Sequence, residues 1–353
     1  MFEIKSDDYS VFVGDVLAKA DEHITKCYTS CHKVILVDEN TAKYCLSKIQ
    51  GLASLQNAEV LQIQSGEEHK TIETTSRIWK HLSSNKVNRK ALFVNVGGGV
   101  ILDMGGFSAS TYKRGIDFIN FPTTLLSQVD ASIGGKLGVD FEGLKNQIGV
   151  FNNPKAVFVH TEFLQTLNER HVLSGFAEII KHALIADIQY FTELKELNFE
   201  HIEELDNIIR QSIEIKNNIV LQDFEERSIR KALNFGHTIG HAIESEHLNH
   251  NNPLLHGEAI AIGMICEAYL SYLSGFISME AVMEVANYIN SVFTKVDLDS
   301  NTYHRLIELM QHDKKNINKG INFTLLERIG LAKVNQTCSV EQIIDALDFY
   351  KNH

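Results

Sequence analysis

The sequence predicts an α/β first half, built on a mostly parallel sheet, followed by an all-α second half. Three observations predict this fold class. Strand-like segments alternate with helix-like ones up to about residue 160, as in parallel sheets covered by helices. Beyond that residue, apolar positions recur at three- and four-residue spacing. The length of 353 residues exceeds one ordinary compact domain, so we expect domains at 1–160 and 161–353.

The strands of the first half are short β-branched or aromatic runs, most of them ended by polar, glycine or proline residues. They are expected at 34–37, 60–63, 92–96, 118–121 and 156–159, the last being the final clear strand of the chain. A helical pattern at 71–82 separates the second strand from the third. This alternation predicts a Rossmann-like domain with helices on the faces of its sheet.

The helices of the second half follow from long apolar periodicities. They are expected at 174–186, 202–221, 229–246, 257–273 and 279–293. Only one of the three prolines, Pro253, lies in this half, within a polar loop. Because proline interrupts helices, its scarcity supports a nearly all-helical second domain.

Composition narrows the class of partner and the compartment. The net charge of −12 argues against nucleic acid, although local lysines can still build a pocket for an anionic substrate. No apolar run reaches membrane-spanning length, and the N-terminus lacks the basic flank and apolar core of a signal peptide. The five irregularly spaced cysteines are interpreted as ordinary thiols. We therefore expect a cytoplasmic protein that does not contact membranes.

A glycine-rich turn, Gly97-Gly98-Gly99, follows the third strand and precedes a helix. Such a turn lets the backbone approach a pyrophosphate at a helix N-terminus, but a tight turn explains it equally well. Leu102 stands where the dinucleotide motif has its third glycine, so the match is poor. Asp38 and Asn40 end the first strand and the polar segment 65–70 follows the second, which places them where open α/β sheets bind ligands.

A group of histidines and a carboxylate predicts a metal centre. His237 and His241 are four residues apart on an expected helix, and His256 begins the next one, so their imidazoles can converge. Glu178 is a carboxylate on an otherwise apolar helix, with Lys181 one turn later. Two histidines and one carboxylate form a common catalytic zinc shell. Spacing leaves open which histidines bind, and a hydrogen-bonded core histidine is the alternative for any one of them.

Basic side chains in glycine-bearing loops suggest a site for an anion. Lys136 follows two glycines, and Lys145 and Asn146 follow another, so ammonium groups lie beside exposed amides suited to phosphate or carboxylate. A solvated lysine is the usual interpretation of each one alone. The set that extends this cluster is Arg114, Lys181, Lys216, Arg230, Lys314 and Lys315.

With these residues described, the sequence resembles the 3-dehydroquinate synthases of the sugar phosphate cyclase family. The resemblance runs from Val34 to about residue 330. The matching segments are Ser65-Gly66-Glu67 with Lys70, Gly97 to Ile101 with Asp103, Lys113-Arg114-Gly115, Phe121 to Leu126 with Gln128 and Asp130, Ser132 to Lys136, Lys145-Asn146, Ala177-Glu178 with Lys181, Leu233 to His237 with His241, Leu255 to Glu258, and Asp313-Lys314-Lys315.

The resemblance implies a dehydroquinate synthase-like fold, a homodimer, and the use of NAD with one divalent metal, zinc or cobalt. It implies conversion of 3-deoxy-D-arabino-heptulosonate 7-phosphate to 3-dehydroquinate and phosphate, a lyase reaction of the shikimate pathway of aromatic amino-acid biosynthesis. The expected steps are transient oxidation by NAD, phosphate elimination, re-reduction and intramolecular aldol closure.

The resemblance also implies roles for individual residues. The implied metal ligands are Glu178, His237 and His256, with His241 facing the substrate instead. The implied NAD contacts are Asp38, Asn40, Glu67, Lys70, Gly98, Gly99, Val100, Ile101, Asp103, Thr123, Thr124, Lys136, Lys145, Phe163, Leu164, Gln165 and Thr166. The implied substrate contacts are Asp130, Lys136, Asn146, Lys181, Lys216, Arg230, Asn234, His241, one of Lys314 and Lys315, and Arg114 reaching into the neighbouring subunit. Leu102, a departure from relatives, is expected on the turn that faces NAD.

Three other functions compete with this one. A related cyclase would act on sedoheptulose 7-phosphate, which has no carboxylate, whereas Lys216, Arg230 and Asn234 favour an acidic substrate. A metal-dependent polyol dehydrogenase would only oxidise its substrate. A degenerate relative would bind or scaffold without catalysis, but the expected ligands and lysines are all present.

Overall fold

The computed structural model describes residues 1–353 except 143, 198–201, 249–251 and 313–320. It divides into two compact units, one formed by Met1–Asn168 with His201–Asn217 and the other by Glu169–Glu200 with Asn218–His353. The division falls eight residues later than the expected boundary at 160. It also assigns most of α8 (Ile202–Gln222) to the first unit and its last turn to the second.

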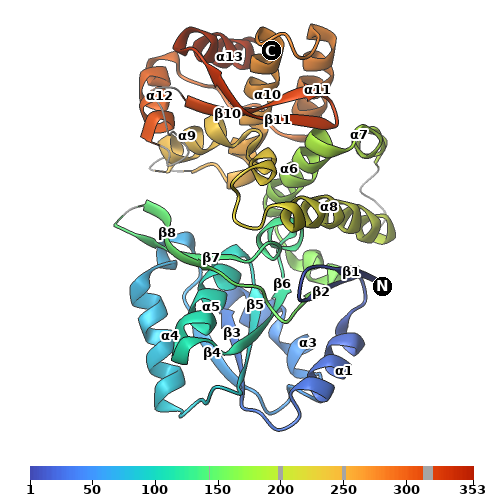
Figure 1. Ribbon diagram of the computed structural model, residues 1–353, viewed down its shortest axis with the longest axis vertical. Coiled ribbons are helices and arrows are strands. Elements are labelled where there is room, and N and C mark those ends of the chain that lie inside the picture. The colour runs from blue at the N-terminus through green and yellow to red at the C-terminus, as the bar shows by residue number, and fades with distance from the viewer. Residues whose placement is uncertain (143, 198–201, 249–251, 313–320) are drawn as a thin grey trace. The chain divides into compact units, whose positions relative to one another are not determined.

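A seven-stranded sheet forms the centre of the first unit (Figure 1). The strands follow one another in the order β1 (Phe2–Lys5), β2 (Ser10–Val13), β9 (Ala156–Val159), β6 (Asp117–Pro122), β5 (Leu92–Gly97), β3 (Lys33–Asp38) and β4 (Glu59–Ile63). All neighbouring strands pair in parallel except β1 with β2. The predicted α/β domain with its mostly parallel sheet is therefore confirmed.

Alternate residues of each central strand pack against different helices, because successive side chains of a strand point to opposite faces. In β3, Ile35 and Val37 join a core with α1 (Leu17–Cys27) and α3 (Leu46–Gln50). Val34 and Leu36 join a second core with α4 (Ile72–Ser84) and α5 (Gly99–Thr111). The sheet is thus covered on both faces.

Several elements of the first unit were not predicted. They are α1, α3, β1, β2 and the hairpin of β7 (Lys136–Phe141) with β8 (Leu144–Phe151), together with α2 (Glu39–Tyr44), the 3-10 segments η1 (Glu67–His69), η2 (Tyr112–Arg114) and η4 (Thr161–Thr166), and the π-helical turn η3 (Ser127–Ala131). β8 is largely exposed, so the hairpin lacks the clean apolar pattern that identifies a buried strand.

The direction in which successive strands are added to the sheet reverses at β3. The chain runs outward from β3 to β4, then crosses back so that β5 lies on the other side of β3. The carboxyl ends of the two strands at this switch are Asp38 and Gly97. Open α/β sheets bind ligands outside such a switch point, so the glycine-rich turn lies at the expected edge.

The second unit is mainly helical. Its helices are α6 (Glu169–Ala186), α7 (Ile188–Lys195), α9 (His237–His247), α10 (His256–Leu273), α11 (Met279–Val292), α12 (Tyr303–His312) and α13 (Val340–Asn352), with 3-10 segments η5 (Ile229–Asn234) and η6 (Ser300–Thr302). α10 is apolar on all sides and packs against α6, α9, α11, α13 and β10. An all-round apolar helix belongs in the centre of a domain. Among the described residues, every helix is too short or too polar to span a lipid bilayer.

Two predictions for the second half are wrong in detail. The half is not all-α, and 156–159 is not the last strand of the chain, because β10 (Ile321–Arg328) and β11 (Leu331–Cys338) form an antiparallel hairpin in the second half. The hairpin turns at Gly330, whose φ of +85° suits glycine, and Leu326 N–H donates to Ser271 of α10.

The expected helix at 229–246 is also interrupted. A 3-10 turn ends at Asn234, Gly236 adopts a left-handed φ of +79°, and α9 begins at His237. The apolar periodicity continues through this break, which is why the sequence does not reveal it.

Candidate functional site

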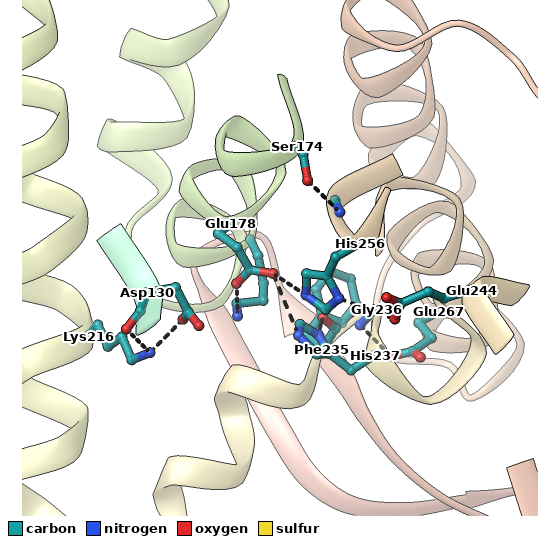
Figure 2. Close-up of polar contacts among 12 residues, drawn as sticks. Asp130, Ser174, Glu178, Lys216, Phe235, Gly236, His237, Glu244, His256 and Glu267 are labelled. Atoms are coloured by element: carbon teal, nitrogen blue, oxygen red, sulfur yellow. Dashed lines mark hydrogen bonds and ion pairs between the residues drawn. The ribbon is translucent and has the colours of Figure 1, made fainter. Parts of the chain in front are cut away.

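Four side chains of the second unit converge where three helices meet. His237 is the first residue of α9, His241 lies one turn later, His256 is the first residue of α10, and Glu178 comes from the middle of α6. Ligand nitrogens of the three histidines lie within 4.8 Å of one another. Glu178 Oε1 lies 3.6 Å from His237 Nε2 and 3.4 Å from His256 Nε2 (Figure 2). The structure therefore brings together the three ligands implied by resemblance and His241 as well.

This cluster fits a divalent cation. Tetrahedral ligands at zinc bond lengths lie roughly 3.3 Å apart, close to both distances from Glu178 Oε1. Glu178 is fully buried, and among the described residues its Oε1 atom has the ion-pair contacts to His237 and His256 but no hydrogen bond. A buried oxygen left in this state is costly unless something binds it, and a metal ion would do so.

Two histidines have outer partners that aim their Nε2 atoms at the cluster. His237 Nδ1 lies 3.1 Å from the carbonyl oxygen of Phe235, which can only accept, so Nδ1 carries the proton. His256 Nδ1 lies 3.4 Å from Glu244 Oε2. Such partners fix the tautomer of ligating histidines. The sequence analysis missed Glu244, although it follows His237 by seven residues and so lies on the same face of α9.

Charge in the cluster is balanced locally. The buried Lys181 Nζ donates to Glu178 Oε2. Burial alone would raise the pKa of Glu178, but Lys181, His237 and His256 hold it well below its ordinary value. Burial and Lys181 lower the pKa of His237 well below its ordinary range. Burial also acts to lower the pKa of His256, yet the carboxylates of Glu178 and Glu244 raise it to about 10. Binding a metal at His256 would therefore displace a proton.

The helices that carry the cluster approach closely because glycines face each other. A Cβ at Gly263 of α10 would lie 1.9 Å from the carbonyl oxygen of Gly236, and one at Gly240 would lie 3.0 Å from that of Ala259. A Cβ at Gly257 would lie 1.9 Å from the Ser174 carbonyl of α6. The helix that packs against the glycines of α9 is therefore α10.

A loop before α9 holds two of the implied substrate contacts. Arg230 is 1% exposed, its backbone N–H donates to Asp223, and its guanidinium donates to the carbonyl of Phe224. Asn234 Nδ2 donates to Glu226 Oε1 over 2.7 Å. Burial acts to raise the pKa of Asp223, but backbone N–H donors at residues 227, 228 and 230 lower it to about 2. Asp223 thus fixes the loop around Arg230.

In the first unit, the glycine-rich turn joins β5 to α5 with its backbone unobstructed. Gly98 is the N-cap of α5 and has no side chain to satisfy the helix amides. Thr123 N–H donates to the Gly97 carbonyl over 3.0 Å, which brings the implied contacts Thr123 and Thr124 beside the turn. The expectation that Leu102 lies on the turn facing NAD is wrong. Leu102 lies inside α5 and is 1% exposed.

Four implied contacts of the first unit form one polar cluster. Lys70 is 4% exposed, and its Nζ donates to Asp103 Oδ2 over 2.6 Å and to Asn146 Oδ1 over 2.7 Å, with Glu67 at 3.9 Å. Burial raises the pKa of Asp103 and of Glu67. Burial acts to lower the pKa of Lys70, but the carboxylates of Asp103 and Glu67 keep this pKa above its ordinary value. Asp140, missed by the sequence analysis, accepts from the Asn146 N–H.

The other implied residues of the first unit lie outside this polar cluster. Lys216 Nζ donates to Asp130 Oδ1 over 2.6 Å and to the Asp130 carbonyl over 2.7 Å. Asp38 caps α2 by accepting from Thr41 N–H, and Asn40 is exposed inside α2 and not at the strand end. The remaining positions are the partly exposed Val100, the buried Ile101, Phe163 and Leu164, and the exposed Arg114, Lys136, Lys145, Gln165 and Thr166. Lys314 and Lys315 lie outside the described residues.

Comparison with known proteins covers both units. The chain matches the 3-dehydroquinate synthase N-terminal family model over residues 60–174 and the C-terminal model over 175–316. It is 44% identical over 320 residues to a 3-dehydroquinate synthase from Parabacteroides distasonis, covering 90% of each chain. It is 42% identical to one from Sulfurovum sp., covering 85% of each.

A solved structure is similar over almost the full length. A 2-deoxy-scyllo-inosose synthase, complexed with carbaglucose-6-phosphate, NAD+ and Co2+, superposes with a TM-score of 0.86 at 26% identity, covering 98% of each chain. The sequence relatives and the matched family models agree with one another. This chain belongs to the 3-dehydroquinate synthase family.

Proposed function

We propose that this protein is a 3-dehydroquinate synthase that converts 3-deoxy-D-arabino-heptulosonate 7-phosphate to 3-dehydroquinate and phosphate. Family membership over both units defines the reaction class. The observation that carries the proposal is the convergence of Glu178, His237 and His256, because an NAD-linked lyase of this type needs a site that polarises a sugar oxygen. It acts in the shikimate pathway of aromatic amino-acid biosynthesis.

The cofactors we propose are NAD and one divalent metal, zinc or cobalt. The solved relative was complexed with NAD+ and Co2+, and a 2-epi-5-epi-valiolone synthase of the same fold had NAD+ and Zn2+ bound. The metal, when bound by Glu178, His237 and His256, supplies a Lewis acid for the substrate oxygens. NAD, when bound at the carboxyl edge of the sheet, supplies a reversible hydride acceptor, so the net reaction is a lyase reaction.

In this proposal, unit 1 binds NAD and unit 2 provides the metal ligands. Gly98 and Gly99 leave room for a pyrophosphate at the start of α5. Lys70, Asp103 and Asn146 form a preorganised polar wall, since each is already fixed by hydrogen bonds. Asn234 and His241 flank His237 along the chain and are assigned to the sugar acid. Lysine and arginine side chains fix the anionic ends of the substrate, so much of the catalysis is positioning and charge stabilisation.

We also propose a cytoplasmic homodimer. Arg114 is exposed and has a left-handed φ of +69°, followed by Gly115 at +111°. This turn joins the end of α5 to the start of β6, at the opposite edge of the sheet from the glycine-rich turn, which suits an arginine that serves a neighbouring subunit. Measurement of molar mass in solution, with and without Arg114→Ala, tests the dimer separately from the role of the arginine.

The decisive experiment measures two products in one reaction. Purified protein is incubated with the seven-carbon sugar acid phosphate, a catalytic amount of NAD and zinc or cobalt. We expect stoichiometric phosphate release with no net NADH absorbance. Accumulating NADH would select a dehydrogenase, and phosphate release from sedoheptulose 7-phosphate but not from the acid would select another cyclase. Absence of both products, with metal added, would contradict the enzymatic assignment.

A further inference from the structure

The start of α9 lacks a cap of its own. Gly236 is the N-cap residue, and it has no side chain to accept from the first amides of the helix. Its φ of +79° favours glycine. An added Cβ would lie 2.6 Å from Met264 Cγ and 3.0 Å from Met264 N. Close packing against α10 therefore prevents the serine or aspartate that usually fills this position.

Glu267 of α10 supplies the missing acceptors. Its Oε2 atom accepts from Gly236 N–H over 2.6 Å (Figure 2), and its Oε1 atom accepts from Ile239 N–H over 3.1 Å. Glu267 is fully buried. A buried carboxylate is expensive unless it is hydrogen-bonded, and two backbone donors at a helix N-terminus are a favourable partner for it.

The bond to Gly236 also reaches a histidine of the candidate metal centre. The Gly236 N–H and the Phe235 carbonyl belong to one peptide unit, which is planar and rigid. The carbonyl of that unit accepts from His237 Nδ1 at 3.1 Å. Glu267 is therefore hydrogen-bonded to the N–H of this peptide, while His237 is hydrogen-bonded to its carbonyl oxygen. A rotation of this peptide would move the acceptor that fixes the tautomer of His237.

We propose that Glu267 is a positioning residue for the metal centre, acting on His237 through the Phe235–Gly236 peptide. Its carboxylate fixes the orientation of the peptide, the peptide fixes the proton on His237 Nδ1, and Nε2 is left to bind the metal. The inference rests on the metal-binding part of the proposed function and not on the reaction that follows.

The test is the affinity of the protein for Co2+, measured by competition with a chelator and by the visible absorption of bound cobalt. Glu267→Gln keeps the shape but turns an NH2 group toward one of the two N–H donors. We expect it to lower cobalt affinity by about tenfold and to change the absorption spectrum, and Glu267→Ala to lower affinity by up to about 100-fold.

Ser271→Ala is the matched control. Ser271 is buried four residues further along α10, where its Oγ accepts from Leu326 N–H of β10 and donates to the backbone carbonyl of Glu267, so its removal perturbs the same part of α10 without changing the Glu267 carboxylate. It should leave cobalt affinity and spectrum unchanged. The inference would be overturned if Glu267→Gln kept the cobalt affinity and the spectrum of the wild type, or if Ser271→Ala lost as much cobalt affinity as the Glu267 variants. It would also be overturned if the wild type bound no cobalt. Because cobalt binding needs no turnover, a wild type that binds cobalt without releasing phosphate would contradict the proposed reaction alone.

Discussion

The candidate metal centre of the second unit and the glycine-rich sheet edge of the first are built in opposite ways. The metal centre consists of buried and half-buried side chains from three helices, whose outer partners are further side chains and carbonyls. The sheet edge consists of backbone that lacks side chains at Gly98 and Gly99, bordered by a hydrogen-bonded group around Lys70. The metal centre should therefore fail when a side chain is removed, and the sheet edge when one is added.

Removal of a histidine ligand should have the largest effect. We expect His256→Ala to lower kcat/KM by about 1000-fold, because a metal contributes several kcal/mol to stabilisation of transition-state charge. Bound metal per chain, measured by elemental analysis, should fall in parallel. His304→Ala, at an exposed position of α12, controls for loss of any histidine. Full activity and full metal content in His256→Ala would rule out this residue as a ligand.

Removal of the cation beside Glu178 should cost stability. Lys181→Met leaves a buried carboxylate without its nearest partner, and we expect the metal-free protein to lose about 3 kcal/mol of unfolding free energy. Denaturant titration in the presence of a chelator measures it. The double variant Glu178→Leu/Lys181→Met should recover much of the loss, because no unpaired charge remains buried. If the single and double variants unfold at the same denaturant concentration, the pair is not coupled as described.

Addition of a methyl group at the sheet edge should affect cofactor binding more than folding. A Cβ at Gly98 would lie 3.2 Å from Thr124 Cγ2, whereas one at Gly97 would lie 2.4 Å from Ile101 Cβ. We expect Gly98→Ala to weaken NAD binding about tenfold with little loss of stability, because the methyl occupies the approach to the backbone. Gly97→Ala should instead destabilise the fold by about 2 kcal/mol. Unchanged NAD affinity in Gly98→Ala, measured by calorimetry, would argue against a pyrophosphate at this turn.

The smallest expected effect is a pH dependence in the loop around Arg230. Because the pKa of Asp223 is lowered to about 2, its contribution to stability is present above its unfolded value near 4 and is lost as pH falls through 2. The Asp223→Asn variant should be less stable than wild type by about 1 kcal/mol at pH 6, allowing for solvent screening, with the difference vanishing near pH 2. If the stability difference between wild type and Asp223→Asn grew as the pH fell, the predicted direction of the pH dependence would be wrong.

Much of the fold was predictable because it rests on regular patterns. The periodicities at 202–221 and 257–273 match α8 and α10 within one residue at each end. The hairpins β7–β8 and β10–β11 were not predicted, since each forms a two-stranded sheet apart from the seven-stranded one, and β8 and β11 are partly exposed. The break at Gly236 was hidden because the apolar period continues across it.

The sequence predicted the residues of the candidate metal centre but not the residues that hold them in position. Glu178, His237, His241 and His256 are visible as histidines and a carboxylate on apolar helices, and the structure brings all four together. Glu267 and Gly236 are 31 residues apart and meet only because α9 and α10 pack through glycines. No spacing rule links such residues, so their contact depends on the tertiary structure.

The central claim is that Glu178, His237 and His256 hold a metal while His241 remains available to the substrate. Anomalous diffraction from crystals of the cobalt-loaded protein tests it most directly. The account predicts one peak within about 2.1 Å of Glu178 Oε1, His237 Nε2 and His256 Nε2, with His241 outside bonding distance. A peak bonded to the three histidines without Glu178, or no peak in this cluster at full cobalt loading, would contradict the account.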